Sequence, residues 1–327
     1  MSEALKRRIL SQVQDDLVQI EAALAENLAP HLDLVSEVAG YILFAGGKRL
    51  RPLLTVLSAR LCDYQAEHLI KMSTIFEYLH AATLLHDDLV DGSGMRRGKP
   101  AAHELWDNAT VVLVGDFLLA RSLTLAAETG SPRVIDVIAR ITENMSQGEI
   151  QQLQRKGALD VTEAEYCDLI RRKTAVLFQG ACRVSAILAG AGTEKETALD
   201  AYGLHLGMAF QMADDLLDYT VDNAALGKPS GSDLREGKLT LPVIHTLSRA
   251  AAEDLGRIRQ IIARPDFETA EFLELIRLME RYGGIEYTRQ RAGEHIQRAC
   301  AALAVFDSGP AREVLADIAR YALTRQA

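Results

Sequence analysis

One stretch decides how this chain is interpreted: His80-Ala-Ala-Thr-Leu-Leu-His-Asp87-Asp88-Leu-Val-Asp91. On a helix, positions i, i+4, i+7 and i+11 share one face, so Asp87 and Asp91 fall on the same stripe as His80. Asp88 lies beside that stripe. Like charges four residues apart repel each other and weaken a helix. We therefore expect a cation to bind between Asp87 and Asp91; the alternative is a solvated helix end that carries three acids.

The residues around this stretch indicate which cation and which ligand would bind. Carboxylate oxygens without thiolates or clustered imidazoles suit Mg²⁺, and also Mn²⁺. Mg²⁺ usually takes one or two carboxylates and completes its coordination with water and substrate phosphate. Arg96 and Arg97 follow a short glycine-containing segment, and arginine binds phosphate through paired N–H groups. The stretch therefore predicts a magnesium–phosphate site.

A second aspartate cluster repeats the pattern later in the chain. Its residues lie at helical spacing and are Gly207, Gln211, Asp214, Asp215 and Asp218. A loop with Gly227, Lys228, Gly237 and Lys238 follows. One D-D-x-x-D motif is weak evidence for a magnesium–phosphate site, but two such motifs in matching contexts are strong evidence for one. Six carboxylates around one cavity would be unstable without cations, and several Mg²⁺ ions that bridge a diphosphate would stabilise them.

A third motif, Gly46-Gly47-Lys48-Arg49-Leu50-Arg51-Pro52, precedes an apolar helical pattern. Glycines and cations at a helix N-terminus favour an anion, although a helix C-cap followed by a solvated basic turn would also fit. With Lys173, the basic residues exceed what one diphosphate requires, so we expect two anionic substrates. Small residues such as Gly180 line the expected helix 162–190, which permits close packing or leaves room for a hydrocarbon channel.

Composition favours an all-α protein. The chain has 327 residues, of which 48% are hydrophobic and only 6% aromatic, and alanine and leucine are good helix formers. The formal charge of −9 and the absence of a basic domain argue against nucleic acid as a partner. The four scattered cysteines and the absence of a signal peptide or an 18-residue uncharged apolar run predict a reduced protein in the cytoplasm.

The helical periodicity predicts about a dozen helices in one domain, residues 1–327. No strand alternation or hairpin signal stands out. We expect residues 92–100 to form a loop, and we expect the main helices at 4–26, 33–45, 68–91, 101–128, 132–156, 162–190 and 198–219, with further amphipathic helices over 243–327.

Taken together, the two aspartate clusters, the Gly46–Pro52 motif and the 227–242 loop resemble the trans-prenyltransferases, or polyprenyl diphosphate synthases, over essentially the whole chain. The sequence is similar in particular to the bacterial octaprenyl diphosphate synthase subgroup. The resemblance implies a helical bundle around a deep central cavity, usually a homodimer. It also implies head-to-tail condensation of isopentenyl diphosphate onto an allylic diphosphate such as farnesyl diphosphate, with Mg²⁺.

The resemblance also implies roles for individual residues. Isopentenyl diphosphate would be held by Lys48, Arg51, His80 and Arg97. The metal ions on the allylic diphosphate would be held by the two clusters, Asp87, Asp88, Asp91, Asp214, Asp215 and Asp218. The allylic substrate or its leaving group would be contacted by Arg96, Lys173, Thr174, Gln211, Lys228 and Lys238. Among all these, Asp87, Asp91, Lys173 and Lys238 are the candidate catalytic residues.

Product length follows from the residues that precede Asp87. In this family, bulky aromatics four or five residues before the first aspartate shorten the tunnel, whereas here Thr83 and Ala82 are small. The facing segment, 119–127, includes Ala126 and Ala127 and no aromatic residue. We expect an octaprenyl to decaprenyl product for quinone side chains, passed on to membrane enzymes. Ordinary small-residue helix packing is the alternative.

Other functions remain to be weighed. Glu77 and His80 match half of a di-iron E-x-x-H pattern, but a second half is missing. A terpene cyclase would not need Lys48, Arg51 and Arg97. A shorter-chain synthase, making geranylgeranyl or farnesyl diphosphate, or a non-catalytic subunit of a heteromeric synthase stays open.

Overall fold

The computed structural model describes residues 2–29, 31–66, 68–219, 231–264 and 266–324. The first part of the chain forms α1 (Ser2–Glu26), α2 (Asp33–Leu43), α3 (Leu50–Leu61), α4 (Leu69–Ser73), α5 (Ile75–Asp91), α6 (Asn108–Glu128) and α7 (Pro132–Arg155). The second part forms α8 (Glu163–Ile170), the π-helical turn η2 (Arg171–Ala175), α9 (Val176–Leu188), α10 (Gly192–Leu217), α11 (Ser232–Arg235), α12 (Leu241–Arg249), α13 (Ala252–Ile262), α14 (Thr269–Arg281), α15 (Gly284–Ala302) and α16 (Pro310–Thr324). Two 3₁₀ turns, η1 (Ala102–Glu104) and η4 (Leu303–Val305), join them. The predicted all-α class is confirmed.

The expected helix 68–91 is divided at Thr74. The Oγ atoms of Ser73 and Thr74 donate hydrogen bonds to the backbone carbonyls of Ile70 and Lys71, at 2.7 and 2.6 Å. Such side-chain bonds compete with the helix ladder, so α4 ends there and α5 begins at Ile75. The break leaves α5 with an uninterrupted run to the first aspartate cluster.

The expected loop 92–100 contains a small hairpin, which the sequence analysis missed. Strand β1 (Met95–Arg96) pairs antiparallel with β2 (Lys99–Pro100). The two residues between them, Arg97 and Gly98, have φ values of 51° and 74°. Two-residue hairpin turns favour positive φ at both positions, and the asparagine or aspartate that usually signals such a turn is replaced here by arginine.

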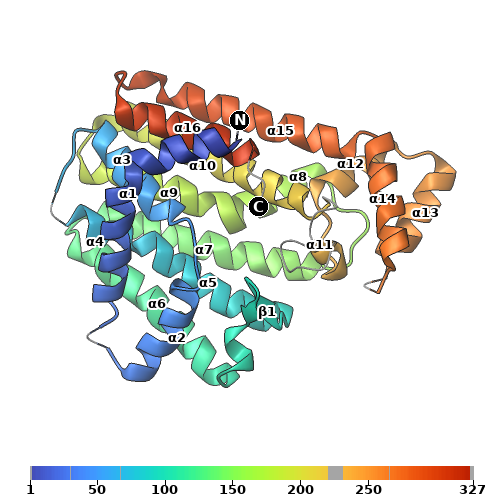
Figure 1. Cartoon of the computed structure of the whole chain (residues 1–327), viewed down its shortest axis with the longest axis horizontal. Coiled ribbons are helices and arrows are strands. Elements are labelled where there is room, and N and C mark those ends of the chain that lie inside the picture. Colours follow the sequence, from blue (N-terminus) through green and yellow to red (C-terminus); the bar gives the residue numbers. More distant parts are fainter. Residues whose placement is uncertain (1, 30, 67, 220–230, 265, 325–327) are drawn as a thin grey trace.

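Long helices lie side by side in the body of the molecule (Figure 1). Helix α10 packs against α9 and α15, while α5 packs against α6. Close approach depends on glycine: a Cβ atom at Gly203 would lie 2.5 Å from the Phe178 carbonyl oxygen, and one at Gly180 would lie 2.2 Å from Ile141 Cδ1. Gly180 of α9 and Gly203 of α10 therefore serve close helix packing.

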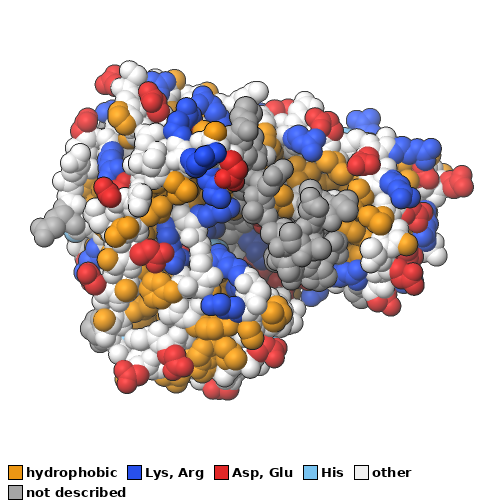
Figure 2. Space-filling view, in the orientation of Figure 1, with side chains coloured by type: hydrophobic (Ala, Val, Ile, Leu, Met, Phe, Trp, Pro, Cys, Tyr) orange, Lys and Arg blue, Asp and Glu red, His pale blue; other side chains and the backbone are white. Residues whose placement is uncertain are grey.

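A smaller hydrophobic cluster lies at the end of the molecule where α13 and α14 project (Figure 1). Its buried residues include Tyr219, Leu234 and Phe272. This cluster anchors α11, which follows the second aspartate motif. The molecule's surface is hollowed near the middle of the view, with lysine and arginine side chains around the hollow (Figure 2).

Two further features bear on the sequence predictions. All four cysteines, each within the described ranges, are free thiols. Helix α6 is long and apolar enough to cross a membrane by length and composition alone, but 39% of its most apolar window is buried inside the protein. Core helices of soluble proteins also meet this criterion of length and composition.

Candidate active site

The first aspartate cluster occupies the last turn of α5. Gly92 adopts φ 66° and ends the helix. Asp87 and Asp91 are partly exposed, whereas Asp88 is 2% exposed. Both oxygens of Asp88 accept hydrogen bonds from Arg96, at 2.6 and 2.5 Å. Asp88 therefore fixes the hairpin arginine against α5, while Asp87 and Asp91 stay partly exposed.

The second cluster, at the end of α10, has the same division. Asp215 is 4% exposed and accepts hydrogen bonds from Tyr166 Oη at 2.6 Å and Gln211 Nε2 at 2.7 Å. Asp214 is exposed. Asp218 accepts the backbone N–H groups of Ser232 and Asp233, at 3.0 and 3.1 Å. In each motif the middle aspartate is buried and bonded within the protein, and the outer two flank the open side.

The lysine of the π-helical turn lies beside the first cluster. Lys173 Nζ is 3.8 Å from Asp87 Oδ2 and forms an ion pair with Glu149 of α7. A Cβ atom at Gly148 would lie 3.2 Å from the Lys173 backbone nitrogen, and one at Gly207 would lie 2.5 Å from Ala175 Cα. The turn is thus packed between two glycines, and π-turns are frequent at functional sites.

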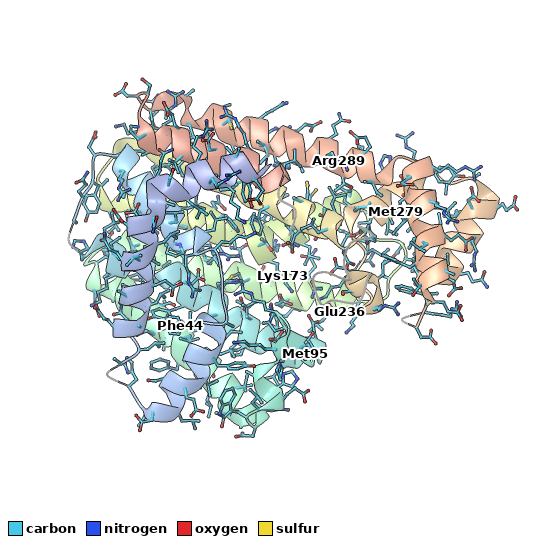
Figure 3. All side chains as sticks on the ribbon, in the orientation of Figure 1. Phe44, Met95, Lys173, Glu236, Met279 and Arg289 are labelled. Atoms are coloured by element: carbon cyan, nitrogen blue, oxygen red, sulfur yellow. The ribbon has the colours of Figure 1, made fainter. Side chains whose placement is uncertain are left out.

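The next residue of that turn contacts the second cluster. Thr174 Oγ1 donates a hydrogen bond to Gln211 Oε1 at 2.8 Å, and Gln211 continues the chain to Asp215. Consecutive residues of one turn, Lys173 and Thr174, therefore link both aspartate motifs. Figure 3 shows Lys173 near the centre of the view.

The loop after the second cluster returns to the first. Lys238 Nζ lies 2.8 Å from Asp91 Oδ2 and 2.6 Å from Glu236 Oε2. Burial alone would lower the pKa of Lys238, but its contacts with Glu236 and Asp91 raise the pKa above its usual value. The Gly157 N–H donates to the Gly237 carbonyl at 2.9 Å and holds this loop in place.

Three basic residues of the Gly46–Pro52 motif take different positions. Lys48 is exposed. Arg49 is 5% exposed and pairs with Glu21 and Glu77, at 2.6 and 2.9 Å, so it has a structural role and removes Glu77 from any metal site. The Arg51 guanidinium lies 4.8 Å from the Phe178 ring centroid. Its buried Nε has no hydrogen-bond partner within the described part of the chain.

His80 and Arg97 lie close to the same motif. Burial and the positive charges of Arg51 and Arg97 hold the pKa of His80 well below its usual range, so His80 is neutral. A Cβ atom at Gly47 would lie 3.4 Å from Arg97 Nη1, which places that guanidinium against the glycine loop. We call Lys48, Arg51, Arg97 and the neutral His80 the basic pocket. Its positive charges suit a strongly charged anion.

Two of the aspartates have carboxyl groups with a raised pKa. Burial, opposed by Lys173 and reinforced by Glu149, raises the pKa of Asp87 to about 7. Burial also raises the pKa of Asp215 to about 7, against its hydrogen bonds from Tyr166 and Gln211. Perturbed carboxyl groups of this kind are typical of functional sites.

The structure leaves one predicted residue out and adds others. Lys228 lies outside the described residues. Glu149, Tyr166 and Glu236 were missed because no local motif marks them. Glu149 and Tyr166 reach the site through tertiary contact, whereas Glu236 contacts Lys238 two positions along the same loop. His86, which lies next to the first cluster, is 3.2 Å from the Val112 carbonyl oxygen and packs on Gly115, so it joins α5 to α6.

The clusters suit a metal that substrate helps to coordinate. Within residues 2–29, 31–66, 68–219, 231–264 and 266–324, no group of three or more His, Cys, Asp or Glu side chains forms a complete metal cage. Pairs of outer carboxylates, Asp87 with Asp91 and Asp214 with Asp218, fit Mg²⁺, which keeps water and phosphate among its ligands. The donor set of oxygens alone also admits Mn²⁺ or Ca²⁺.

Comparisons with known proteins show which family the chain belongs to. The family model described as Polyprenyl synthetase matches residues 32–279. The chain is 41% identical to octaprenyl diphosphate synthase of Escherichia coli (strain K12), over 95% of this chain and 96% of that protein. It is 38% identical to all-trans-nonaprenyl-diphosphate synthase (geranyl-diphosphate specific) of Rhodobacter capsulatus, over 99% of both. The polyprenyl synthase of Caulobacter crescentus CB15, crystallised with calcium and isoprenyl diphosphate, superposes with a TM-score of 0.91 at 39% identity, covering 98% of both chains.

Proposed function

Since the chain belongs to the polyprenyl synthetase family, we propose that it condenses isopentenyl diphosphate repeatedly, head to tail, onto an allylic diphosphate such as farnesyl diphosphate. The chain is a prenyltransferase of the long-chain polyprenyl diphosphate synthase type. The observation that carries the proposal for this site is the contact of Lys238 with Asp91, which joins the two aspartate motifs around one space.

In this proposal Asp87 and Asp91, with Asp214 and Asp218, hold Mg²⁺ on the allylic diphosphate. Asp88 and Asp215 contribute by fixing Arg96 and Gln211, because both are buried and bonded to these side chains. Asp218 also accepts two backbone N–H groups, but it is only partly buried. Bound Mg²⁺ would neutralise charge that develops on the departing diphosphate. The calcium in the Caulobacter crescentus protein supports a divalent cation in the family.

The basic pocket is proposed to hold isopentenyl diphosphate. Lys48, Arg51 and Arg97 supply positive charge, and neutral His80 can donate one hydrogen bond without adding charge. The buried Arg51 Nε supports this assignment, because an unpaired buried donor is costly unless a ligand satisfies it. A terpene cyclase would not need this second anion-binding site.

The chain's own residues then account for the reaction. Lys173 and Lys238 stabilise negative charge on the leaving diphosphate as the allylic C–O bond breaks. Thr174 and Gln211 orient that group beside them. The double bond of isopentenyl diphosphate attacks the allylic cation, and a proton passes to the released diphosphate. Apolar walls keep water from the cation.

Product length is proposed to be octaprenyl to decaprenyl, for quinone side chains. Ala82 is fully buried and Thr83 partly buried on α5, so neither closes the path behind Asp87 with a large side chain. On the facing helix α6, Ala126 is buried and Ala127 is exposed. The octaprenyl and nonaprenyl products named for the two relatives support this range.

A homodimer is also proposed. Helices α6 and α7 pack together and leave large apolar side chains exposed: Val112, Leu113, Leu123, Ile135, Ile150 and Leu153. Contiguous exposed apolar surface marks interaction sites. Light scattering should therefore give twice the 35.8 kDa chain mass, and Leu113→Glu should yield monomer. Location in the cytoplasm and delivery of product to membrane enzymes stay predictions.

One assay tests the proposed reaction. Purified protein is incubated with radiolabelled isopentenyl diphosphate, farnesyl diphosphate and Mg²⁺, and the products are sized by chromatography. We expect a metal-dependent product in the octaprenyl to decaprenyl range. Geranylgeranyl diphosphate alone would indicate the short-chain alternative, and no incorporation without a second protein would indicate a subunit of a heteromeric synthase.

A further inference from the structure

Each of the two site lysines is held by a pair of carboxylates, one inside an aspartate cluster and one outside. Lys173 Nζ lies 3.8 Å from Asp87 Oδ2, forms an ion pair with Glu149 and is 3.4 Å from Gln152 Oε1. Lys238 lies between Asp91 and Glu236. The two glutamates come from different elements, α7 and the segment after α11, yet they take the same position relative to lysine and cluster.

Both glutamates are fixed by a neighbouring glycine. Gly148 precedes Glu149, and a Cβ atom there would lie 3.1 Å from Arg172 Cβ and 3.2 Å from the Lys173 nitrogen. Gly237 follows Glu236, has φ 76° and would place a Cβ atom 3.1 Å from the Gly157 nitrogen. Larger residues would push both backbones away, so each glutamate is set at a close-packed point.

The proposed reaction creates a problem that these glutamates solve. When Asp87 and Asp91 turn to metal, they give up part of their hold on the two lysines. A lysine side chain has four rotatable bonds and loses rotamer entropy when it is fixed in one conformation. A lysine freed from its aspartate would have to be ordered again for every diphosphate. An ammonium group has three donors, so one glutamate can hold it while the other N–H bonds reach the diphosphate.

We propose that Glu149 and Glu236 are positioning residues, which hold Lys173 and Lys238 at the diphosphate once Asp87 and Asp91 bind metal. The inference rests on the proposed function of this site. Glu149 acts across the site from α7, at the Asp87 end. Glu236 acts from the loop, at the Asp91 end. Neither glutamate touches the substrate.

If the two glutamates acted only through their negative charge, removing them would have the opposite effect on diphosphate binding from the loss of a positioning residue. Removing a negative charge beside a site for diphosphate should strengthen anion binding, and alanine or glutamine would do so equally. Loss of a positioning carboxylate should weaken binding. Alanine should then be worse than glutamine, because the amide oxygen of glutamine still accepts a hydrogen bond from lysine.

The test is calorimetric titration of inorganic diphosphate into the full chain at saturating Mg²⁺. Alanine and glutamine variants are made at Glu149 and at Glu236, and Glu143→Ala on the exposed side of α7 is the control. We expect each alanine variant to weaken binding about tenfold, the size of one charge-assisted hydrogen bond. Each glutamine variant should fall between alanine and wild type, and Glu143→Ala should match wild type.

Two kinds of outcome would overturn the inference. Unchanged or tighter binding by both alanine and glutamine variants would assign only a charge effect. An unchanged diphosphate affinity with a shifted half-saturating Mg²⁺ concentration would make the glutamates metal ligands. Failure of the wild type itself to bind diphosphate with Mg²⁺ would instead refute the proposed function.

Kinetics give an independent measurement on the same variants. The alanine variants should raise KM for the allylic diphosphate and lower kcat, while KM for isopentenyl diphosphate stays at the wild-type value. Melting temperatures within a few degrees of wild type establish that the variants fold. A general structural defect would raise both KM values together, and that result would contradict a positioning role.

Discussion

Lys238 Nζ lies 2.8 Å from Asp91 Oδ2, although 147 positions separate the two residues in the sequence. The contact joins the end of the first aspartate motif to the loop that follows the second. Asp218 holds the start of that loop through the N–H groups of Ser232 and Asp233. Residues 232–238 of the loop therefore contact both motifs, which supports the proposal that the two carboxylate clusters form one site.

The first prediction concerns metal binding by the first cluster. Asp87→Ala should lower kcat by at least about a thousandfold, because loss of a metal-binding carboxylate removes several kcal/mol of charge stabilisation in the transition state. Steady-state kinetics at saturating Mg²⁺ measure this. Asp15→Ala, on the exposed face of α1, is the control. A near-normal rate for Asp87→Ala would remove this residue from the mechanism.

The second prediction separates the middle aspartate from its neighbours. Asp88→Asn should reduce the free energy of unfolding by about 2 kcal/mol, because it removes the charge of the buried partner in a partly buried ion pair with Arg96. Asp136→Asn breaks the exposed pair with Arg140 and should cost less than about 1 kcal/mol. Urea denaturation measures both. Equal losses would mean that burial does not distinguish the Asp88 pair.

The third prediction concerns chain length. Ala82→Phe should shorten the product, since a bulky ring would fill the path behind Asp87. Ala127→Phe, on the exposed side of α6, should leave the length unchanged. Circular dichroism establishes that each variant is folded, and chromatography sizes the products. An unchanged product length in folded Ala82→Phe would show that the growing chain takes another path.

The fourth prediction concerns stability and pH. His295 Nδ1 lies 3.0 Å from His205 Nδ1. Burial, His205, Arg298 and Arg291 lower the pKa of His295 to about 4, with Glu294 opposing them. In the unfolded chain a histidine titrates near pH 6.5. Protonation of the unfolded state should therefore remove about 1 to 3 kcal/mol of stability as pH falls from about 6.5 to 4.

His295→Gln provides the comparison for that measurement. The variant lacks the titrating group, so its stability should fall less than that of the wild type over the same pH interval. Denaturant unfolding at pH 7 and pH 4.5 gives the two differences. Identical pH dependence in wild type and variant would show that His295 is not held neutral by the fold.

The sequence predicted the helical class and the two aspartate motifs because both depend on local spacing. Helical periodicity put Asp87 and Asp91 on one stripe and Asp88 beside it, and the structure has that arrangement. The partner of Asp88 was out of reach, because Arg96 meets it only through a hairpin whose turn contains arginine in place of asparagine or aspartate. The local sequence pattern therefore located the cluster, but it did not show that Asp88 is paired with Arg96 while Asp87 and Asp91 remain partly exposed.

Tertiary contact decided what the sequence left open. The Gly46–Pro52 motif has three basic residues, Lys48, Arg49 and Arg51, which the sequence alone does not tell apart. Arg49 is buried with Glu21 and Glu77, while Lys48 is exposed. The π-helical turn at Lys173 depends on glycines in two other helices, Gly148 and Gly207. No helical pattern marks such a turn: the expected helix 162–190 is present as the contiguous α8, η2 and α9, and its π-helical turn could not be predicted from local spacing.

The central claim is that both aspartate motifs bind one metal–diphosphate complex. Crystals of the protein grown with Mn²⁺ and inorganic diphosphate test it through anomalous scattering, which locates the metal directly. We expect anomalous peaks beside Asp87 and Asp91 and beside Asp214 and Asp218, with a single diphosphate between them in contact with Lys173 and Lys238. Metal at only one motif, or diphosphate bound away from both lysines, would contradict it.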